Sequence, residues 1–170
     1  PLAHALIRQS DLWNQNRIRT TFRGTPFADI DDILLRFQAE PPDPEGGVIT
    51  ASDLDCVMYP AWHALPQVAP LVMGVMAQVG GIRLGRVLIT RLAPGGRILR
   101  HNDKGSVYAD TYQRYHLVVS GSPGSLFVTG DEQVCMVTGD VWWANVCEEH
   151  ECYNNSACDR VHLLIDVQPL

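Results

Sequence analysis

The sequence has 170 residues, 46% of them hydrophobic and 19% charged, with a formal net charge of −6. This length and composition predict one soluble globular domain over residues 1–170, and no run of about 18 apolar residues offers a membrane-spanning helix. The negative charge argues against general binding to nucleic acids or anionic lipids, so we expect a small-molecule or protein substrate and no nucleic-acid or membrane partner.

The start of the chain and its cysteines both bear on location. The chain starts at Pro1, and PLAHALIRQS lacks the charged-then-apolar pattern of a signal peptide, so we interpret the start as trimmed. Five cysteines are an odd number in a chain too long to need disulfide staples, which favours reduced thiols in a reducing compartment. We therefore expect a cytoplasmic protein.

Residues 1–83 are expected to be mainly helical. In residues 28–38 (ADIDDILLRFQ), apolar side chains recur at helical spacing after Pro26, and acidic residues occupy the first turn, which predicts an amphipathic helix. The same spacing over residues 66–81 (PQVAPLVMGVMAQVGG) predicts a second helix that ends at its two glycines. Residues 39–47 (AEPPDPEGG), between them, are a predicted surface loop.

From residue 84 onward, short β-branched and aromatic runs alternate with Gly, Asn, Asp and Ser. The predicted strands are residues 85–93, 114–121, 125–130, 132–139, 140–146 and 160–167. This spacing predicts a mainly β, antiparallel sandwich or barrel over residues 84–170, buttressed by the helices of residues 1–83. No phosphate-binding glycine-rich loop is present, which argues against a nucleotide enzyme.

Residues 100–105 (RHNDKG) allow two interpretations. Asn, Asp and Gly are common in turns, so a polar turn is the simpler one. The other is a metal site, because His101 and Asp103 are two residues apart and point to the same side of an extended strand. His150, after the predicted strand 140–146, supplies a third candidate ligand. Two histidines and one carboxylate suit a non-haem Fe(II) centre with open positions, although catalytic zinc uses the same set.

A structural zinc site is a competing hypothesis. Five candidate ligands fall within sixteen residues: Cys147, His150, Cys152, Cys158 and His162. Structural zinc usually draws on paired ligands from two knuckles, and no second knuckle exists here. Buried cysteines beside a strand are therefore the preferred interpretation.

Arg160 lies ten residues after His150, beyond the predicted turn NNSACD. If the flanking strands form a hairpin, the Arg160 guanidinium lies across the turn from His150 and can enter the same cavity. There it would bind the carboxylate of a small diacid with two parallel hydrogen bonds. The alternative is a surface arginine paired with Asp159 or Glu151.

Three segments resemble the aspartyl/asparaginyl β-hydroxylase family of Fe(II)- and 2-oxoglutarate-dependent oxygenases. They are TRLAPGGRILRHND, RYHLVVSG and GDVWWANVCEEHECYNNSACDRVHLLIDV, within residues 84–168. The resemblance implies a double-stranded β-helix, also called a jelly roll or cupin-like barrel. It also implies iron binding by His101 and His150, a contact of Arg160 with the distal carboxylate of 2-oxoglutarate, and further contacts of this co-substrate with His116 and Thr90.

Asp103 departs from the animal members of the family, which have glycine there and bind iron through two histidines. The His-x-Asp pattern instead resembles free-amino-acid hydroxylases such as proline cis-4-hydroxylases, so the substrate of the animal enzymes is not implied. Arg114, two residues before His116, matches an arginine that contacts substrate in the family. It is the candidate substrate-binding residue, with a solvent-exposed strand-end arginine as the alternative.

These observations predict a jelly-roll dioxygenase in which His101, Asp103 and His150 hold Fe(II). With 2-oxoglutarate and O₂, and with ascorbate as reductant in assays, it would hydroxylate an unactivated C–H bond of an amino-acid-type substrate. That substrate is an Asp or Asn residue in a protein, or a free or carrier-bound amino acid. The alternative is a non-catalytic cupin-like module that holds a metal or a small acid. Oligomeric state is not predicted.

Overall fold

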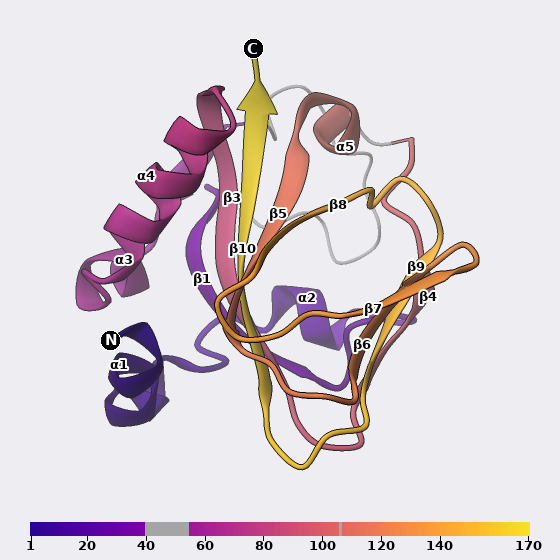
Figure 1. Ribbon diagram of the computed structural model, residues 1–170. Coiled ribbons are helices and arrows are strands. Elements are labelled where there is room, and N and C mark those ends of the chain that lie inside the picture. Colours follow the sequence, from indigo (N-terminus) through magenta and orange to yellow (C-terminus); the bar gives the residue numbers. More distant parts are fainter. Residues whose placement is uncertain (40–54, 106) are drawn as a thin grey trace.

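Two antiparallel sheets face each other in the computed structural model, which describes residues 1–39, 55–105 and 107–170 (Figure 1). The described strands are β1 (Ile30–Gln38), β2 (Cys56–Met58), β3 (Gly81–Leu92), β4 (Arg97–His101), β5 (Gln113–Ser120), β6 (Ser125–Thr129), β7 (Glu132–Cys135), β8 (Val141–Ala144), β9 (His150–Asn154) and β10 (Arg160–Pro169). The larger sheet has the order β2-β1-β3-β10-β5-β8, and the smaller sheet has the order β4-β9-β6-β7.

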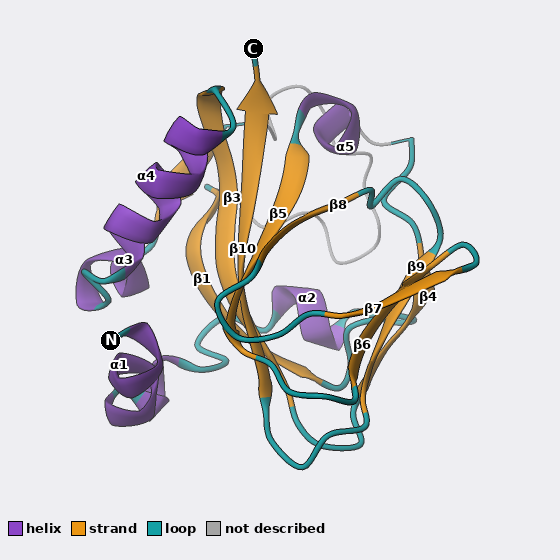
Figure 2. Cartoon of the chain, in the orientation of Figure 1, coloured by secondary structure: helices purple, strands orange, loops and turns teal. Residues whose placement is uncertain are grey.

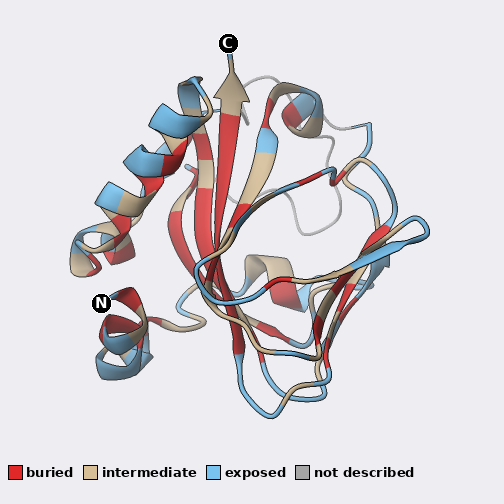
Figure 3. Cartoon of the chain, in the orientation of Figure 1, coloured by how far each residue is buried: buried red, intermediate tan, exposed pale blue. Residues whose placement is uncertain are grey.

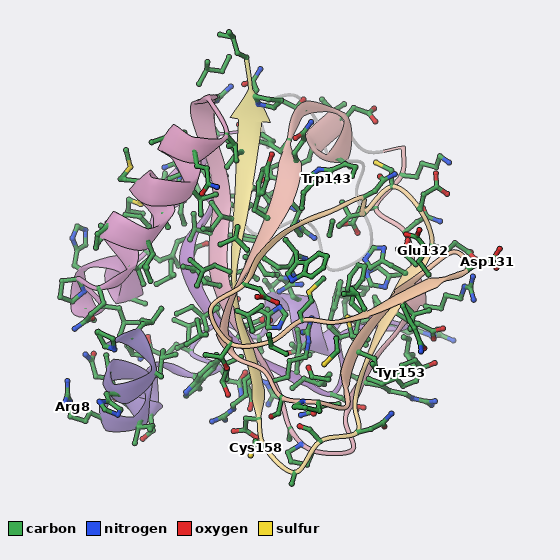
Figure 4. The ribbon with its side chains drawn as sticks, in the orientation of Figure 1. Arg8, Asp131, Glu132, Trp143, Tyr153 and Cys158 are labelled. Carbon is green, nitrogen blue, oxygen red and sulfur yellow. The ribbon has the colours of Figure 1, made fainter. Side chains whose placement is uncertain are left out.

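The connectivity from β3 to β10 is that of a jelly roll. Each strand is followed by one in the opposite sheet, except that β6 and β7 form a hairpin within the smaller sheet. Asp131 and Glu132 lie at the tip of this hairpin (Figure 4). Eight strands wound in this way form a double-stranded β-helix, and β1 and β2 extend its larger sheet. The predicted fold class is confirmed.

The helices α1 (Leu2–Arg8), α3 (Pro60–Ala64) and α4 (Val68–Gln78) cover the outer face of the larger sheet (Figure 2). The described helices are α1 (Leu2–Arg8), the 3₁₀ helix η1 (Ser10–Leu12), α2 (Ile18–Thr21), α3 (Pro60–Ala64), α4 (Val68–Gln78) and α5 (Val107–Thr111). Val68, Val72 and Val75 of α4 recur at helical spacing and are buried against the sheet, as predicted for residues 66–81. The largest buried cluster therefore lies between the helices and the larger sheet, where Figure 3 shows the buried strand centres.

Alternate side chains of β10 lie on two different faces, one in the apolar core and one toward the candidate site. Val161, Leu163, Ile165 and Val167 belong to the helix-facing core. The residues between them, Arg160, His162, Leu164 and Asp166, are buried on the opposite side of the strand, toward the space between the sheets. A strand with apolar side chains on one face and mostly polar ones on the other normally exposes the polar face to water. Here the polar face is buried, which indicates an internal polar site.

The helix predicted for residues 28–38 is wrong, because these residues form β1. Seven of the nine residues of β1 are buried, on both faces of the strand. Such a run satisfies helical spacing as well as strand spacing.

The predicted hairpin between the strands of His150 and Arg160 is also wrong, since β9 pairs with β4 and β6 while β10 pairs with β3 and β5. The loop predicted for residues 39–47 lies outside the described residues except for Ala39.

In the part of the chain that the structure describes, no helix has the length and apolar character needed to cross a membrane.

Candidate active site

Two histidines meet at the end of the smaller sheet. His101 ends β4, His150 begins β9, and the two are register partners whose ring centroids lie 4.3 Å apart. Nδ1 of His101 lies 2.7 Å from the Leu99 carbonyl oxygen, and Nδ1 of His150 lies 2.9 Å from that of Glu148. Because a carbonyl only accepts, each Nδ1 carries the proton, and each Nε2 keeps its lone pair for a metal. Burial lowers the pKa of His150, which also favours the neutral ligand form.

Asp103 follows the end of β4 and is held on two sides. Its backbone N–H donates to the Val146 carbonyl at 2.9 Å, and its Oδ2 accepts from Arg114 Nη1 at 2.9 Å. Burial alone would raise the pKa of Asp103, but the charge of Arg114 and the nearby His101 and His150 outweigh it and hold this pKa below its usual value. A carboxylate is thus maintained beside the two imidazoles.

These three side chains do not yet converge on one point. Within the described residues, no three His, Cys, Asp or Glu side chains are arranged closely enough to hold a metal ion. The Asp103 carboxylate is directed to Arg114 instead. The structural zinc hypothesis is not supported either. Cys158 is exposed in the turn between β9 and β10 (Figure 4), while His162 belongs to the larger sheet.

A narrow space of about 30 Å³ lies between the sheets next to the histidines. We call it the inner cavity. The smaller sheet contributes Ile98, His101, Phe127, His150 and Cys152 to its lining, and Phe27, in the segment before β1, also lines it. From the larger sheet come Thr90, Arg114, His116, Arg160 and Leu164. Six of the seven predicted site residues therefore line one cavity, although they come from five strands of two sheets.

Arg160 is a buried cation without a counter-ion. It is 2% exposed, and no carboxylate of the described residues lies within ion-pair distance of its guanidinium. Its Nη2 is buried without a hydrogen-bond acceptor. Of the two interpretations of Arg160 from the sequence, the surface arginine paired with Asp159 or Glu151 is wrong. A buried, unpaired guanidinium is costly and indicates a site for an anion.

His116 and His162 form a buried pair beside Arg160. Their Nδ1 atoms lie 3.2 Å apart, and the Nε2 atom of each has no partner among the described residues. Burial, followed by the charge of Arg160, lowers the pKa of both histidines well below the usual value. Both rings are thus neutral, so His116 offers the cavity a hydrogen-bonding group and no charge.

Arg114 bridges two carboxylates. Its Nε and Nη2 donate to Asp166 at 2.8 and 3.0 Å, and its Nη1 donates to Asp103. The Asp166 carboxylate also accepts from the Tyr108 hydroxyl at 3.0 Å. Arg114 is therefore not the solvent-exposed arginine considered as an alternative, and its contact with substrate stays a prediction.

Sequence reasoning missed Asp166 and Tyr108. Asp166 follows Arg160 and His162 at even spacing on β10, so the period-two pattern of RVHLLIDV carried a signal for it. Tyr108 lies in α5, which the sequence did not predict. No local pattern pointed to its contact with Asp166, which is 58 residues away in the chain.

A larger cavity of about 310 Å³ adjoins the inner one, and we call it the outer cavity. It is lined by Arg19, Phe27, Arg86, Asn102, Asp103, Lys104, Tyr108, Ala109, Tyr112, Arg114, Val146 and Asp166. Arg19, Phe27, Arg114 and Val146 line both cavities. The candidate iron ligands thus lie where a narrow polar interior meets a wider space.

Comparison with known families decides the class of this protein. The model of the family described as aspartyl/asparaginyl beta-hydroxylase matches residues 57–169. The chain belongs to this family. It is therefore a dioxygenase enzyme of the hydroxylase type, and the family implies Fe(II), 2-oxoglutarate and O₂ in general terms. The resemblance inferred from the sequence is confirmed.

One solved structure shares this fold over nearly the whole chain, and others align over shorter parts of it. An oxidoreductase of the 2OG-Fe(II) oxygenase family from Burkholderia pseudomallei aligns with a TM-score of 0.60 and 16% identity, over 98% of this chain and 78% of that chain. A predicted oxalate decarboxylase from Thermotoga maritima aligns over 56% of this chain and 72% of its own, with a TM-score of 0.41 and 17% identity. A cupin 2 conserved barrel protein from Salinispora arenicola aligns over 48% and 60%, with a TM-score of 0.38 and 14% identity. No curated protein matches the sequence significantly.

Proposed function

We propose that this enzyme hydroxylates an amino-acid-type substrate, with His101, Asp103 and His150 as the ligands of Fe(II) and with 2-oxoglutarate as co-substrate. The observation that carries the proposal is Arg160, a buried guanidinium that has no counter-ion among the described residues and shares the inner cavity with both histidines. Ascorbate is the reductant expected to sustain the activity in assays.

The donor set fits iron. Two imidazoles held through Nδ1 and one ionised carboxylate are the ligand types that non-haem Fe(II) uses when it keeps positions open. The backbone carbonyls of Leu99 and Glu148 fix the orientation of the two rings. When bound, Fe(II) together with 2-oxoglutarate and O₂ supplies the oxidising power that inserts oxygen into a C–H bond.

The larger sheet fits the co-substrate. The Arg160 guanidinium would bind the distal carboxylate of 2-oxoglutarate with a bidentate, charge-assisted pair. Thr90, which is 3% exposed, and the unpartnered Nε2 of His116 would add hydrogen bonds from neighbouring strands. Because the inner cavity measures only about 30 Å³, side chains must move when the diacid enters.

An aromatic side chain packs against each of the two candidate iron-binding histidines. Phe27 meets the His101 ring edge-on at 4.9 Å, and Phe127 stacks on the His150 ring at 5.6 Å. These rings limit the access of water to the reacting centre, which strengthens the electrostatic contacts within it.

Arg160 offers the sharpest test of the proposal. Arg160→Lys keeps the charge but loses the planar fork, and Arg160→Met removes both. We expect apparent 2-oxoglutarate affinity to fall about 30-fold or more in Arg160→Met and clearly in Arg160→Lys. The measurement is anaerobic spectral titration of the Fe(II)-loaded protein with 2-oxoglutarate.

Arg97→Met is the matched control, because Arg97 is an exposed arginine of β4 outside both cavities. It should bind 2-oxoglutarate as the parent does. Unchanged affinity in both Arg160 variants would overturn the assignment of Arg160 and, with it, the main support for 2-oxoglutarate binding in this cavity.

A further inference from the structure

Four basic residues line the outer cavity, and three of them have a carboxylate partner. Arg19 pairs with Asp32 at 2.9 Å, Lys104 lies 3.9 Å from Glu148, and Arg114 bridges Asp103 and Asp166. The fourth is Arg86. No carboxylate in the described ranges lies within 4.0 Å of its guanidinium.

Arg86 is held firmly although no described residue supplies its counter-ion. Its guanidinium lies over the Tyr108 ring at 3.8 Å and over the Phe37 ring at 4.7 Å, and its Nη2 donates to Gln38 Oε1 at 2.6 Å. Its Nε is buried and finds no acceptor in the described residues. Burial lowers the pKa of Arg86, which shows that the surroundings do not fully compensate its charge. Aromatic rings and a neutral amide thus fix a cation at the wall of a cavity.

The position of Arg86 relates the outer cavity to the reaction centre. Arg86 and Thr90 are four residues apart on β3, or about 13 Å along an extended strand. Thr90 lines the inner cavity, and Arg86 lines the outer cavity together with the candidate iron ligand Asp103. An acid bound to Arg86 would therefore occupy the space that leads to the metal without competing for Arg160.

We propose that Arg86 is a specificity-determining residue that binds the free carboxylate of a small acid substrate, of the size of an amino acid, in the outer cavity. This inference rests on the proposed function and narrows its substrate class. About 310 Å³ is at the small end of ligand pockets, which suits a free amino acid. A carrier-bound amino acid has no free carboxylate for Arg86. Arg114, with its donors committed to Asp103 and Asp166, is less able to take this role.

The test compares acids with their neutral counterparts. The proteinogenic L-amino acids and their primary amides are screened by calorimetric titration of the metal-free protein, and by their stimulation of succinate formation from 2-oxoglutarate after Fe(II) loading. We expect one or a few acids to bind, and their amides to bind about 30-fold or more weakly. Arg86→Gln should lower the affinity for the acid to that for its amide, and the affinity of Arg86→Lys for the acid should lie between those of the parent and Arg86→Gln.

Two further variants sharpen the result. Arg83→Gln is the matched control, since Arg83 is an arginine of the same strand with an exposed partner, Asp55. It should bind acids as the parent does. Gln38→Glu places a carboxylate against Arg86 in nearly the same shape, and the Nε2 that it replaces is buried without a partner. Gln38→Glu should weaken acid binding at least about tenfold although Arg86 itself is unchanged. This variant therefore still tests the proposal if Arg86→Gln does not fold.

The outcomes separate this inference from the proposed function. If 2-oxoglutarate binds in an Arg160-dependent manner but no amino acid binds, the assignment of Arg86 is wrong and the proposed function stands. The same conclusion follows if acids and amides bind alike, or if neither Arg86→Gln nor Gln38→Glu changes acid affinity. If acids bind through Arg86 and 2-oxoglutarate does not bind at all, the proposed function fails while Arg86 remains an acid-binding residue.

Discussion

Arg114 connects the candidate metal ligand Asp103 to the interior of the protein. The chain of contacts runs from the Tyr108 hydroxyl to Asp166, from Asp166 to Arg114, and from Arg114 to Asp103. Tyr108 and Asp166 are buried and Arg114 and Asp103 are partly buried, so removal of one charged member leaves its partner with an unpaired charge in a poorly hydrated site. Burial alone would lower the pKa of Arg114, but Asp166 and Asp103 raise it above the usual value, so the guanidinium stays charged. Such a network restrains Asp103 near the two histidines and keeps it ionised before any metal binds.

This arrangement predicts a graded loss of iron binding. Asp103→Ala removes a charged oxygen ligand, and we expect Fe(II) affinity to fall more than about 100-fold. Arg114→Met keeps Asp103 but removes the side chain that orients it, and loss of such a partner typically lowers metal affinity about 10- to 100-fold. Competition with a chromophoric chelator under anaerobic conditions measures both. Asp110→Ala, at an exposed position of α5, is the control. Full Fe(II) affinity in Asp103→Ala would show that Asp103 is a turn residue and not an iron ligand.

Sequence reasoning found six residues of the inner cavity from motif spacing and from the family resemblance. His101, His116, His150 and Arg160 stand out among β-branched and aromatic residues, and the family resemblance gave each a role. Arg86 was not singled out, since a strand arginine is normally exposed. Its significance depends on its surroundings, which are two aromatic rings, a neutral amide and, among the residues that the structure describes, no carboxylate; the rings and the amide come from distant parts of the chain.

At the scale of the elements, β1 shows why a strand can be mistaken for a helix. Ile30, Ile33, Leu34 and Phe37 fit a helical stripe, but Asp32 and Leu35 are buried as well. A strand in the middle of a covered sheet is buried on both faces, so its sequence loses the strict alternation that identifies a half-exposed strand. Six later strands, bounded by Gly, Asn and Asp, were predicted near their observed positions, whereas β4 and β9 were not among the predicted strands.

The contact between α5 and β3 depends on the absence of a side chain at Gly85. A Cβ added there would lie 2.6 Å from the Tyr108 hydroxyl and 2.8 Å from the Tyr112 ring. Gly85→Ala must therefore displace the helix that carries Tyr108, and we expect a loss of about 1–3 kcal/mol in the free energy of unfolding. Because Tyr108 supports both Arg86 and Asp166, acid binding in the outer cavity should weaken too.

Gly74→Ala is the matched control for this substitution. Gly74 lies within α4, and an added Cβ meets nothing within 4 Å. Alanine is a better helix former than glycine by about 0.5–1 kcal/mol, so Gly74→Ala should stabilise the protein by roughly that amount. Urea denaturation of the parent and both variants measures the difference. Equal stability of the parent and Gly85→Ala would show that α5 does not pack on β3 as described.

At the scale of the whole molecule, the two faces of the larger sheet have different tasks. The face toward the helices is an apolar core, while the face toward the smaller sheet buries histidines, arginines and a carboxylate. Burial of such groups without full hydrogen bonding costs free energy of folding. The helical layer offsets this cost with a second, purely apolar interface. The supporting role of residues 1–83 stays a prediction, and the apolar residues of α1, α3 and α4 in this interface are consistent with it.

The buried histidine pair makes the stability of the whole protein depend on pH. His116 and His162 have pKa values well below the usual 6.5 in the folded state, first because of burial and then because of the Arg160 charge. The unfolded chain, whose histidines keep ordinary pKa values, therefore binds protons that the folded chain does not. Stability is complete above about pH 6.5 and declines as the pH falls below it, by about 1.4 kcal/mol per histidine for each pH unit.

We expect urea denaturation of the metal-free protein to show this loss between pH 7.5 and pH 5.5. His162→Leu removes one of the two titrating groups, so the loss over this range should be smaller than in the parent by the contribution of one histidine. Val118→Ala is the control, because Val118 is the buried register partner of His162 and does not titrate. It should lower stability by a similar amount at every pH and leave the pH dependence unchanged. If His162→Leu retains the full pH dependence of the parent, His162 is protonated in the folded protein and the neutral pair is wrong.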